Sequence, residues 1–338
     1  MGCDSPGVAV RGWKKNPEIT RHLTTLLEEK TAGDPMSEKK WVRLSLGQLS
    51  QQLQAADQSA SPPTIARLLD DLDYALRANV KSKEPGSEHP DRDRQFQHIA
   101  EEKRHFLEAG LPVISVDTKK KELIGNFKNP GRVWCQQPEQ VNGHDFLSQG
   151  LGRAVPYGIY DLKLNQGYVY VGQSADTPEF AVDAIVQWWE SDGKGGYPDA
   201  ERILILADAG GSNGARPRRW KQQLQEQLAD RLGLTVTVCH YPTGCSKYNP
   251  IEHKLFSFIS INWAGKPLRT FETVVNYIRE TTTTTGLKVK AVLTNRTYAK
   301  GQRVTDAEMN SLNLTRDATC PDWNYTLQPH HVDACAGA

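Results

Sequence analysis

Three acidic residues are placed where a sheet edge and a helix start could bring carboxylates together. Asp117 closes the apolar run "LPVISVD", Asp208 closes "ERILILAD", and Glu252 follows in "KYNPIEHKLFSF". Clustered carboxylates raise each other's pKa, so a divalent cation that neutralises them stabilises the cluster. Oxygen-only ligands favour Mg²⁺ or Mn²⁺ over zinc, and two such ions about 3.5–4 Å apart stabilise both oxygens of a phosphoryl transfer. The three residues therefore predict two-metal chemistry at phosphorus.

Each acid also has a simpler interpretation, which the residues alone leave open. An aspartate that closes an apolar strand can mark only the point where the strand reaches solvent. Glu252 can complete a capping box, with Asn249 as the N-cap and Pro250 as the first helical residue. Two strand-end aspartates followed by a helix-borne glutamate favour the metal-binding interpretation.

The elements that must position these residues follow an α/β pattern from Leu111 onward. Apolar runs predict three strands, the second being the hairpin partner of the first, at 111–117, 122–127 and 167–174. Two further strands end near Asp208 and Tyr241, and helices follow each of the last three strands. This order predicts a ribonuclease H-like mixed sheet flanked by helices. In such sheets ligands bind beyond the carboxyl ends of the strands, where both aspartates fall.

The residues ahead of the sheet divide into smaller parts. Residues 1–40 form a polar helical segment, and the two short apolar-faced helices within 41–84 have the length and turn of a helix-turn-helix DNA-binding domain. The residues alone favour an ordinary helical hairpin for 41–84, because aspartates on its second helix repel phosphate, and the resemblance set out below favours the helix-turn-helix. We expect a linker and helix over 85–110, the catalytic domain over 111–327 and a disordered tail over 328–338.

Two basic clusters lie beside the predicted catalytic strands. One follows the first aspartate and the other opens the helix after the second: Lys119, Lys120 and Lys121, and Arg216, Arg218, Arg219 and Lys221. A solvated surface is the alternative for each cluster. We expect contacts with DNA phosphates, because positive charge at a helix start opposes the helix dipole and so needs an anionic partner.

Composition restricts the class of protein. The 338 residues carry 41 Lys and Arg against 40 Asp and Glu, so any nucleic-acid surface must be a local patch. No apolar run approaches the roughly 20 residues that span a bilayer, and no secretory leader opens the chain. No pair of the six cysteines has C-x-x-C spacing, which argues against a disulfide framework. We expect a soluble intracellular protein that does not bind membranes.

Several longer stretches resemble bacterial insertion-sequence transposases of the DDE superfamily, in the family called ISAzo-thirteen. They include "VISVDTKKKELIGNFKNPGR", "VPYGIYDL", "RILILADAGGSNGAR", "TVTVCHYPTGCSKYNPIEHKLFSFIS", "TTTTTGLKVKAVL" and "WNYTL". The resemblance runs from about Gly12 to Leu327, and the family's acidic triad falls on Asp117, Asp208 and Glu252. It implies a ribonuclease H-like core with two Mg²⁺ ions, for which Mn²⁺ can substitute. It also implies DNA as partner, a homo-oligomer on that DNA and a place in the bacterial cytoplasm beside the nucleoid.

The activity implied by the resemblance is cleavage of DNA strands at transposon ends and their transfer into target DNA. Two alternatives stay open: a truncated, catalytically inactive copy that only binds DNA, and a metal-dependent nuclease without strand transfer. Family members are longer at the amino end, and Asp73 and Ala209 stand where they usually have glycine. Inverted repeats on both sides of the gene would favour the transposase over a decayed copy.

Overall fold

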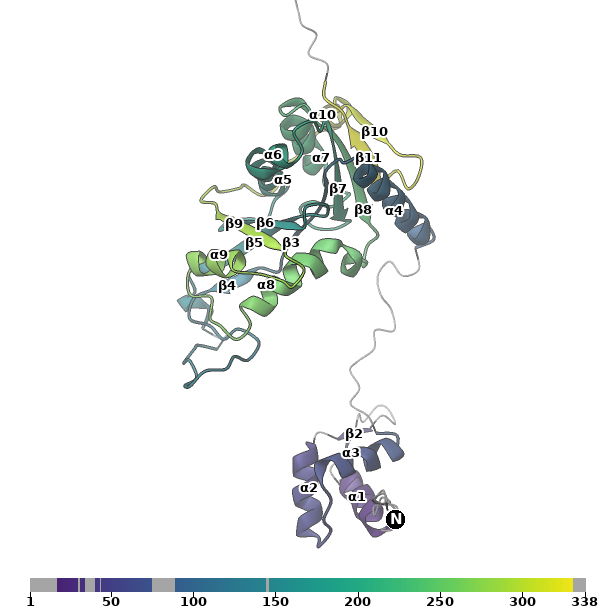
Figure 1. Cartoon of the computed structure of the whole chain (residues 1–338), viewed down its shortest axis with the longest axis vertical. Helices are drawn as coiled ribbons and strands as arrows, with labels where there is room; N and C mark the ends of the chain where they lie inside the picture. Colours follow the sequence, from purple (N-terminus) through teal and green to yellow (C-terminus); the bar gives the residue numbers. More distant parts are fainter. Residues whose placement is uncertain are drawn as a thin grey trace, which may run out of the picture. The chain divides into compact units, whose positions relative to one another are not determined.

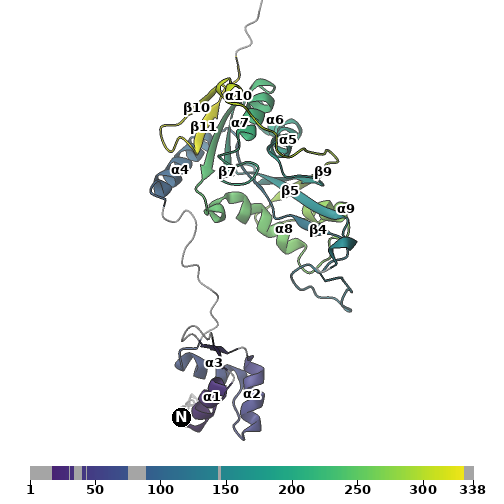
Figure 2. The same ribbon diagram turned by 180° about the vertical axis from the view of Figure 1, so that it is seen from behind.

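The computed structural model describes residues 17–29, 31–33, 40–42, 44–74, 89–143 and 146–330 (Figures 1 and 2). It divides the chain into two compact units, Met1–Ser82 and Lys83–Ala338. Parts of the predicted segments therefore lie outside the described residues: the start of 1–40, the end of 41–84, the start of 85–110 and most of 328–338. None of the described helices is long and apolar enough to cross a membrane.

The first unit is a small cluster of helices. Its elements are α1 (Pro17–Glu29), β1 (Thr31–Gly33), β2 (Lys40–Val42), α2 (Leu46–Ala55) and α3 (Pro62–Asp71). Apolar residues at helical spacing form its core: Leu23, Leu27, Leu49, Leu53, Ile65 and Leu68. Ser45 starts α2 in a capping box with Gln48. The two helices predicted for the helix-turn-helix are thus α2 and α3.

The end of α3 explains one departure from the family's pattern. Asp73 has a φ of 59°, in the left-handed region that glycine adopts without a steric cost. Aspartate tolerates this region better than most residues because its short side chain can bond locally. The backbone therefore keeps the shape for which the family usually has glycine.

A mixed sheet forms the centre of the second unit. Its strands are β3 (Val113–Thr118), β4 (Glu122–Ile124), β5 (Gly152–Asp161), β6 (Gln166–Gly172), β7 (Arg202–Asp208), β8 (Thr235–Tyr241), β9 (Lys288–Leu293), β10 (Leu314–Arg316) and β11 (Asn324–Leu327). Their order is β10-β11-β8-β7-β3-β5-β6-β9, and β4 pairs with β5. β3, β7 and β8 are parallel, and β5 runs antiparallel between β3 and β6. This arrangement confirms the predicted ribonuclease H-like fold.

The predicted hairpin partner of β3 was wrong. The run at 122–127 supplies only the short β4, which pairs with the first residues of β5. β5 itself pairs with β3, from Ile114 opposite Asp161 to Thr118 opposite Tyr157. The reason is burial: β5 is buried from Ala154 to its end, as a central strand must be, whereas Ile124 is the one fully buried residue of β4.

Three strands at the two edges of the sheet carried too weak a pattern to be predicted. β9 joins β6 in parallel and has only one buried residue, Ala291. β10 and β11 form a hairpin whose second strand pairs antiparallel with β8. Edge strands lack the continuous apolar run of a central strand, so their sequences are hard to distinguish from those of loops.

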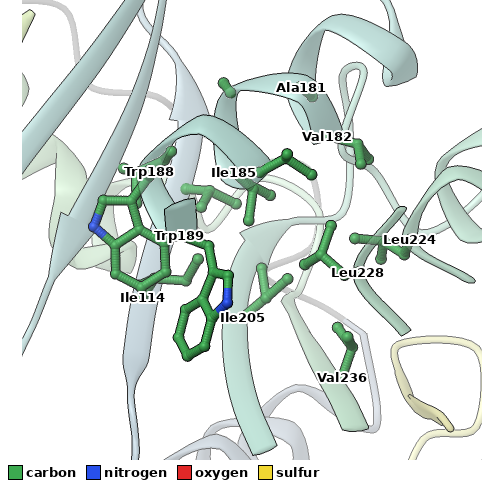
Figure 3. Packing of buried hydrophobic residues seen from close by; sticks show 14 of the residues in the cluster. Ile114, Ala181, Val182, Ile185, Trp188, Trp189, Ile205, Leu224, Leu228 and Val236 are labelled. Carbon is green, nitrogen blue, oxygen red and sulfur yellow. The ribbon is translucent and has the colours of Figure 1, made fainter. Parts of the chain in front are cut away.

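Helices cover both faces of the sheet (Figures 1 and 2). They are α4 (Arg92–Glu108), α5 (Pro178–Trp188), α6 (Lys194–Gly196), α7 (Arg218–Leu224), α8 (Ser257–Asn262), α9 (Phe271–Arg279) and α10 (Asp306–Asn310). α5 and α7 pack on the face that includes Ile114 and Ile205, where Trp188 and Trp189 are buried (Figure 3). α4, α8 and α9 pack on the opposite face, because alternate strand residues such as Val113 and Leu204 point that way.

A glycine lets the helix that begins with Glu252 approach the sheet. Gly158 lies opposite Asp117 in the β3–β5 pair. A Cβ at Gly158 would stand 2.4 Å from Phe256 and 2.9 Å from Ile251. Both of these residues belong to the same helical segment as Glu252, so the close packing sets that segment's distance from β3.

We therefore expect Gly158→Ala to destabilise the second unit. Overpacking a filled core costs about 1–3 kcal/mol, which urea unfolding would measure as a lower free energy of unfolding. Gly195→Ala is the matched control, because nothing lies within 4 Å of a Cβ there. Equal stability of the two variants would show that the helix can move away without cost.

Candidate active site

The parallel pairing of β3 and β7 brings the two predicted aspartates to neighbouring positions. The register matches Val116 with Ala207, and Asp117 and Asp208 are the next residue on each strand. Both side chains fall on the face covered by α4 and α8, since they alternate with residues of the opposite core cluster. The carboxyl edge of the sheet therefore holds two adjacent carboxylates.

Asn249 joins the third predicted acid to this edge. The Ser115 hydroxyl on β3 donates to Asn249 Oδ1 and accepts from the backbone N–H of Ile251 at 3.0 Å. Asn249 Nδ2 donates to Asp208 Oδ1 at 3.1 Å and to Val116 O at 3.3 Å. These bonds hold the start of the Glu252 helix against the ends of β3 and β7.

Glu252 does not complete the capping box that its sequence context allowed. The backbone N–H that a capping glutamate would bind, that of Asn249, donates instead to Ser246 O at 2.9 Å. Asn249 turns its own side chain toward Ser115 and Asp208 rather than toward the helix amides. The Glu252 carboxylate is therefore not held by the helix start.

Burial and neighbouring charges act on all three carboxylates. Burial, and then the charge of Asp208, raise the pKa of Asp117 to about 8, with a further contribution from Glu252. Burial and the charge of Glu252 raise the pKa of Asp208 to about 6, although the bond from Asn249 opposes the shift. Burial also raises the pKa of Glu252, and the nearby Lys119 is the largest influence that opposes this. Without a cation, the site resists carrying three negative charges.

The donor set fits magnesium better than a metal that needs a complete protein cage. Among the described residues, no group of three or more His, Cys, Asp or Glu side chains is placed to hold a single ion. Mg²⁺ usually takes one or two carboxylates and completes its shell with water and substrate phosphates. Three carboxylates whose raised pKa values a bound cation would lower are compatible with such an ion.

A fourth acid, Asp176, lies near the first aspartate and was missed in the sequence. Its Oδ1 accepts from the Thr118 hydroxyl at 3.1 Å, and its charge adds to the raised pKa of Asp117. Lys121 lies 3.7 Å from Asp176 as an ion pair. Asp176 precedes α5 in a polar loop, so no pattern marked it.

The lysines after Asp117 differ in their surroundings. Lys119 is buried, with its ammonium 3.2 Å from Glu122 and 4.6 Å from the centre of the Trp263 ring. Lys120 is exposed and Lys121 is bound to Asp176. Lys119 is therefore a buried cation that lowers the pKa of the neighbouring Glu252. Lys120 is exposed to solvent, and its side chain is the most accessible of the three to a ligand.

The second basic cluster is also divided by burial. Arg216 is exposed, and Arg218 forms an ion pair with Asp306 at 2.6 Å. Arg219 pairs with Glu179 at 2.6 Å on the side of α5. Lys221 is buried, and its ammonium donates to Ala215 O. Arg216 and Arg218 are thus the more accessible to a ligand in solution.

A chain of buried side chains fixes the backbone at Asp208. Burial lowers the pKa of His240 to about 3, so its ring is neutral. His240 Nδ1 lies 2.9 Å from Asp208 O, which can only accept, so this nitrogen carries the proton. His240 Nε2 then accepts from the Tyr325 hydroxyl at 3.1 Å, and that hydroxyl accepts from Trp220 Nε1 at 2.9 Å. No sequence pattern indicates this chain of hydrogen bonds, because β11 was not predicted.

We expect Tyr325→Phe to lower the free energy of unfolding by about 1–3 kcal/mol, since it leaves two buried polar atoms without a partner. Tyr160→Phe is the control, because its hydroxyl bonds only to the half-exposed Asn165, which water can satisfy. Urea unfolding of both variants measures the difference. A loss no larger for Tyr325→Phe than for Tyr160→Phe would contradict a role for the chain in holding Asp208.

Comparisons with known proteins bear on this arrangement. A family model described as "Rhodopirellula transposase DDE domain" matches residues 22–329. No curated protein matches the chain. Similar solved structures include the "Mos1 transposase paired-end complex with left transposon end", at 13% identity and a TM-score of 0.43, covering 83% of this chain and 73% of that chain. The "Mos1 mariner paired end complex with Mn" has 14% identity and a TM-score of 0.42, covering 83% and 73%. The family match spans parts of both units and all three carboxylates.

Proposed function

Because this chain belongs to the transposase DDE-domain family whose model spans residues 22–329, we propose that Asp117, Asp208 and Glu252 are its catalytic carboxylates. A transposase cuts DNA at the ends of a mobile element and joins the freed ends to a target. The observation that supports the assignment is the adjacent placement of Asp117 and Asp208 at the carboxyl edge of the sheet, with Asn249, three residues before Glu252, hydrogen-bonded to Asp208.

The proposed cofactor is a pair of Mg²⁺ ions, for which Mn²⁺ can substitute. Asp117 and Asp208 would hold the ions, and Glu252 would complete the second site. When bound, two such ions stabilise the attacking and the leaving oxygen of a displacement at phosphorus. No Gly-rich phosphate loop or nucleophile–base pair was found in the sequence that would offer another route.

The chain's own residues would prepare this site in three ways. Asn249 orients Asp208 through Oδ1 and leaves Oδ2 for a ligand. Lys119 favours the ionised form of Glu252. The packing of Ile251 and Phe256 against β5 excludes water from the base of the site. Water would cut the phosphodiester and free a 3′-hydroxyl, and that hydroxyl would attack target DNA in the same site without a covalent enzyme intermediate.

The other parts of the chain would bind and align DNA. We propose that residues 41–84 recognise transposon ends through α2 and α3, and that Lys120, Arg216 and Arg218 contact phosphates near the active site. Two ends must be held together to be joined to one target, so we propose a homo-oligomer on DNA. Lys119, Lys121 and Arg219 already pair with acidic residues of the protein and would act mainly through local charge.

The test is cleavage of DNA that carries the inverted repeats flanking the gene. Wild-type protein with Mg²⁺ or Mn²⁺ is expected to leave 3′-hydroxyl ends at the repeat boundary, and EDTA or Asp208→Asn to abolish the cuts. Asp199→Asn, an exposed aspartate away from the cluster, is the control and should cut normally. Cutting by Asp208→Asn at the wild-type rate would refute the site, and no cutting by any protein would favour the inactive-copy alternative.

A further inference from the structure

A cleft of about 1170 Å³ opens next to the carboxylates on the side of β8, β10 and β11. Its walls come from the loop after β7, the starts of α4 and α7, α10, and the β10–β11 hairpin. Ala209, the residue after Asp208, lines it, so the cleft begins where the candidate active site ends. Its volume exceeds the roughly 300–1,000 Å³ of small-molecule pockets, which favours a segment of a polymer as the occupant.

The charges of the cleft leave two cations without an acidic partner. Each acid in the lining pairs with a lining arginine: Asp91 with Arg94 at 3.1 Å, Asp306 with Arg218 at 2.6 Å, and Asp322 with Arg316 at 3.1 Å. Arg216 and Lys221 remain, and neither forms an ion pair with a carboxylate of the described residues. The cleft therefore has a local excess of positive charge that the near-neutral composition does not reveal.

Lys221 is the more informative of the two. It is only 4% exposed, and its ammonium contacts Ala215 O and the face of the Tyr325 ring, 5.1 Å from the ring centre. Neither contact neutralises its charge. Burial and the nearby Arg316 lower the pKa of Lys221 to about 8, although the charge of Asp322 opposes the shift. A buried cation without an ion-pair partner is costly, and an anion bound in the cleft would reduce that cost.

The opposite wall offers an aromatic surface. Trp323 and His89 both line the cleft, with their ring centres 4.7 Å apart and their planes tilted by 50°. Trp323 is half exposed, so one part of its ring is open to a ligand. Proteins that hold single strands combine a positive groove for the backbone with aromatic rings on which bases stack. Duplex DNA keeps its bases stacked inside and has no use for such a ring.

We propose that this cleft binds an unpaired DNA strand that leads away from the active site. A phosphate of the strand lies against Lys221 and Arg216, and a base stacks on Trp323. The inference rests on the proposed function for its choice of DNA, and it goes beyond it by assigning a separate strand-binding site. It also gives the β10–β11 hairpin, which lies at one edge of the sheet, a part in holding the substrate.

The test is binding of a fluorescent oligothymidylate to the full chain in EDTA, where cleavage cannot occur. The variants are Lys221→Met, which keeps the buried volume, Arg216→Gln at an exposed position, and Trp323→Ala. Arg104→Gln is the matched control, since it removes a charge from an exposed arginine outside the cleft. Thermal melting of each variant checks that it is folded. A hairpin duplex of equal length is the second ligand, and inorganic phosphate the competitor.

We expect Lys221→Met and Arg216→Gln each to weaken oligothymidylate binding roughly tenfold and to lower the slope of log affinity against log salt by about 0.7. Trp323→Ala should weaken it at least about fivefold with an unchanged slope, and should not affect the duplex. Arg104→Gln should bind like wild type. If Lys221→Met does not fold, Arg216→Gln and Trp323→Ala carry the test.

Three results would overturn the proposal. The first is no binding of the single strand by wild type, and the second is wild-type affinity in both the Arg216 and Trp323 variants. The third is displacement of the strand by low concentrations of inorganic phosphate, which would indicate a site for a free anion. The outcome is separable from that of the proposed function. Wild type that cuts and joins DNA while the variants bind normally refutes the cleft alone. Strand binding through the cleft without any metal-dependent cutting refutes the catalytic proposal alone.

Discussion

Replacing Glu252 by glutamine is expected to leave a folded protein that binds DNA and neither cuts nor joins it. The amide has the shape of the carboxylate but lacks its charge, so it holds Mg²⁺ poorly. Loss of that electrostatic stabilisation costs at least about 10²-fold in rate. The free energy of unfolding should change little, because the Asn249 amide donates to Ser246 O and does not depend on Glu252. The measurement is metal-dependent cleavage of end-containing DNA, beside a thermal melt.

Glu272→Gln is the matched control for this experiment. Glu272 also lies in the first turn of a helix, α9, but is exposed and outside the carboxylate cluster. It should cut DNA at the wild-type rate. Equal rates for wild type and Glu252→Gln would remove Glu252 from the catalytic set, whereas a Glu252→Gln variant that fails to fold would show an unrecognised structural role.

Replacing Asp117 by asparagine is expected to abolish cleavage and to stabilise the metal-free protein near neutral pH. The folded-state pKa of Asp117 is raised to about 8, against about 3.9 in an unfolded chain. Between these two values the folded carboxyl keeps a proton that the unfolded one has lost. Its contribution to the free energy of unfolding is therefore fully present below about pH 4 and is lost as pH rises toward 8. Asparagine has no such dependence, so its stability should fall less over this window.

Metal binding should reverse this behaviour in the wild type. An ion that binds only the folded state at a hundred times its Kd stabilises it by about 2.7 kcal/mol, so Mn²⁺ should raise the melting temperature at pH 7.5. The Asp117→Asn variant should not respond, and Asp199→Asn should respond like wild type. A wild-type melting curve that is indifferent to millimolar Mn²⁺ would contradict metal binding at this site.

The central strands and their acids could be predicted because their sequences are simple. β3 and β7 are apolar runs that end in aspartate, and parallel strands bring such ends to one edge. Glu252 was visible as a helix-start acid, but only the structure shows that Asn249 is turned to Asp208 and leaves the cap unformed. The hydrogen bond from Asn249 to Asp208 joins residues 41 positions apart, and no local sequence pattern indicates such a bond.

What could not be predicted depends on contacts between distant segments. The chain from Trp220 through Tyr325 and His240 to Asp208 requires the pairing of β11 with β8, and β11 has no strong strand pattern of its own. The same holds for the burial of Lys119 under Trp263, since a run of three lysines normally indicates a solvated surface. The long β5 was missed because the run at 122–127, which comes next in the chain, was expected to pair with β3. Burial along 154–161 would have indicated the central strand instead.

The most direct test of the account is strand joining by pre-cleaved ends. End DNA with a free 3′-hydroxyl is mixed with a supercoiled plasmid, Mg²⁺ or Mn²⁺, and either wild type or Asp208→Asn. Joining needs the same carboxylates as cleavage but no prior cut, so it separates a transposase from a simple nuclease. The account predicts joined products with wild type and none with Asp208→Asn or in EDTA. Wild type that cuts intact ends but never joins pre-cleaved ones, or Asp208→Asn that joins them as well as wild type, would contradict it.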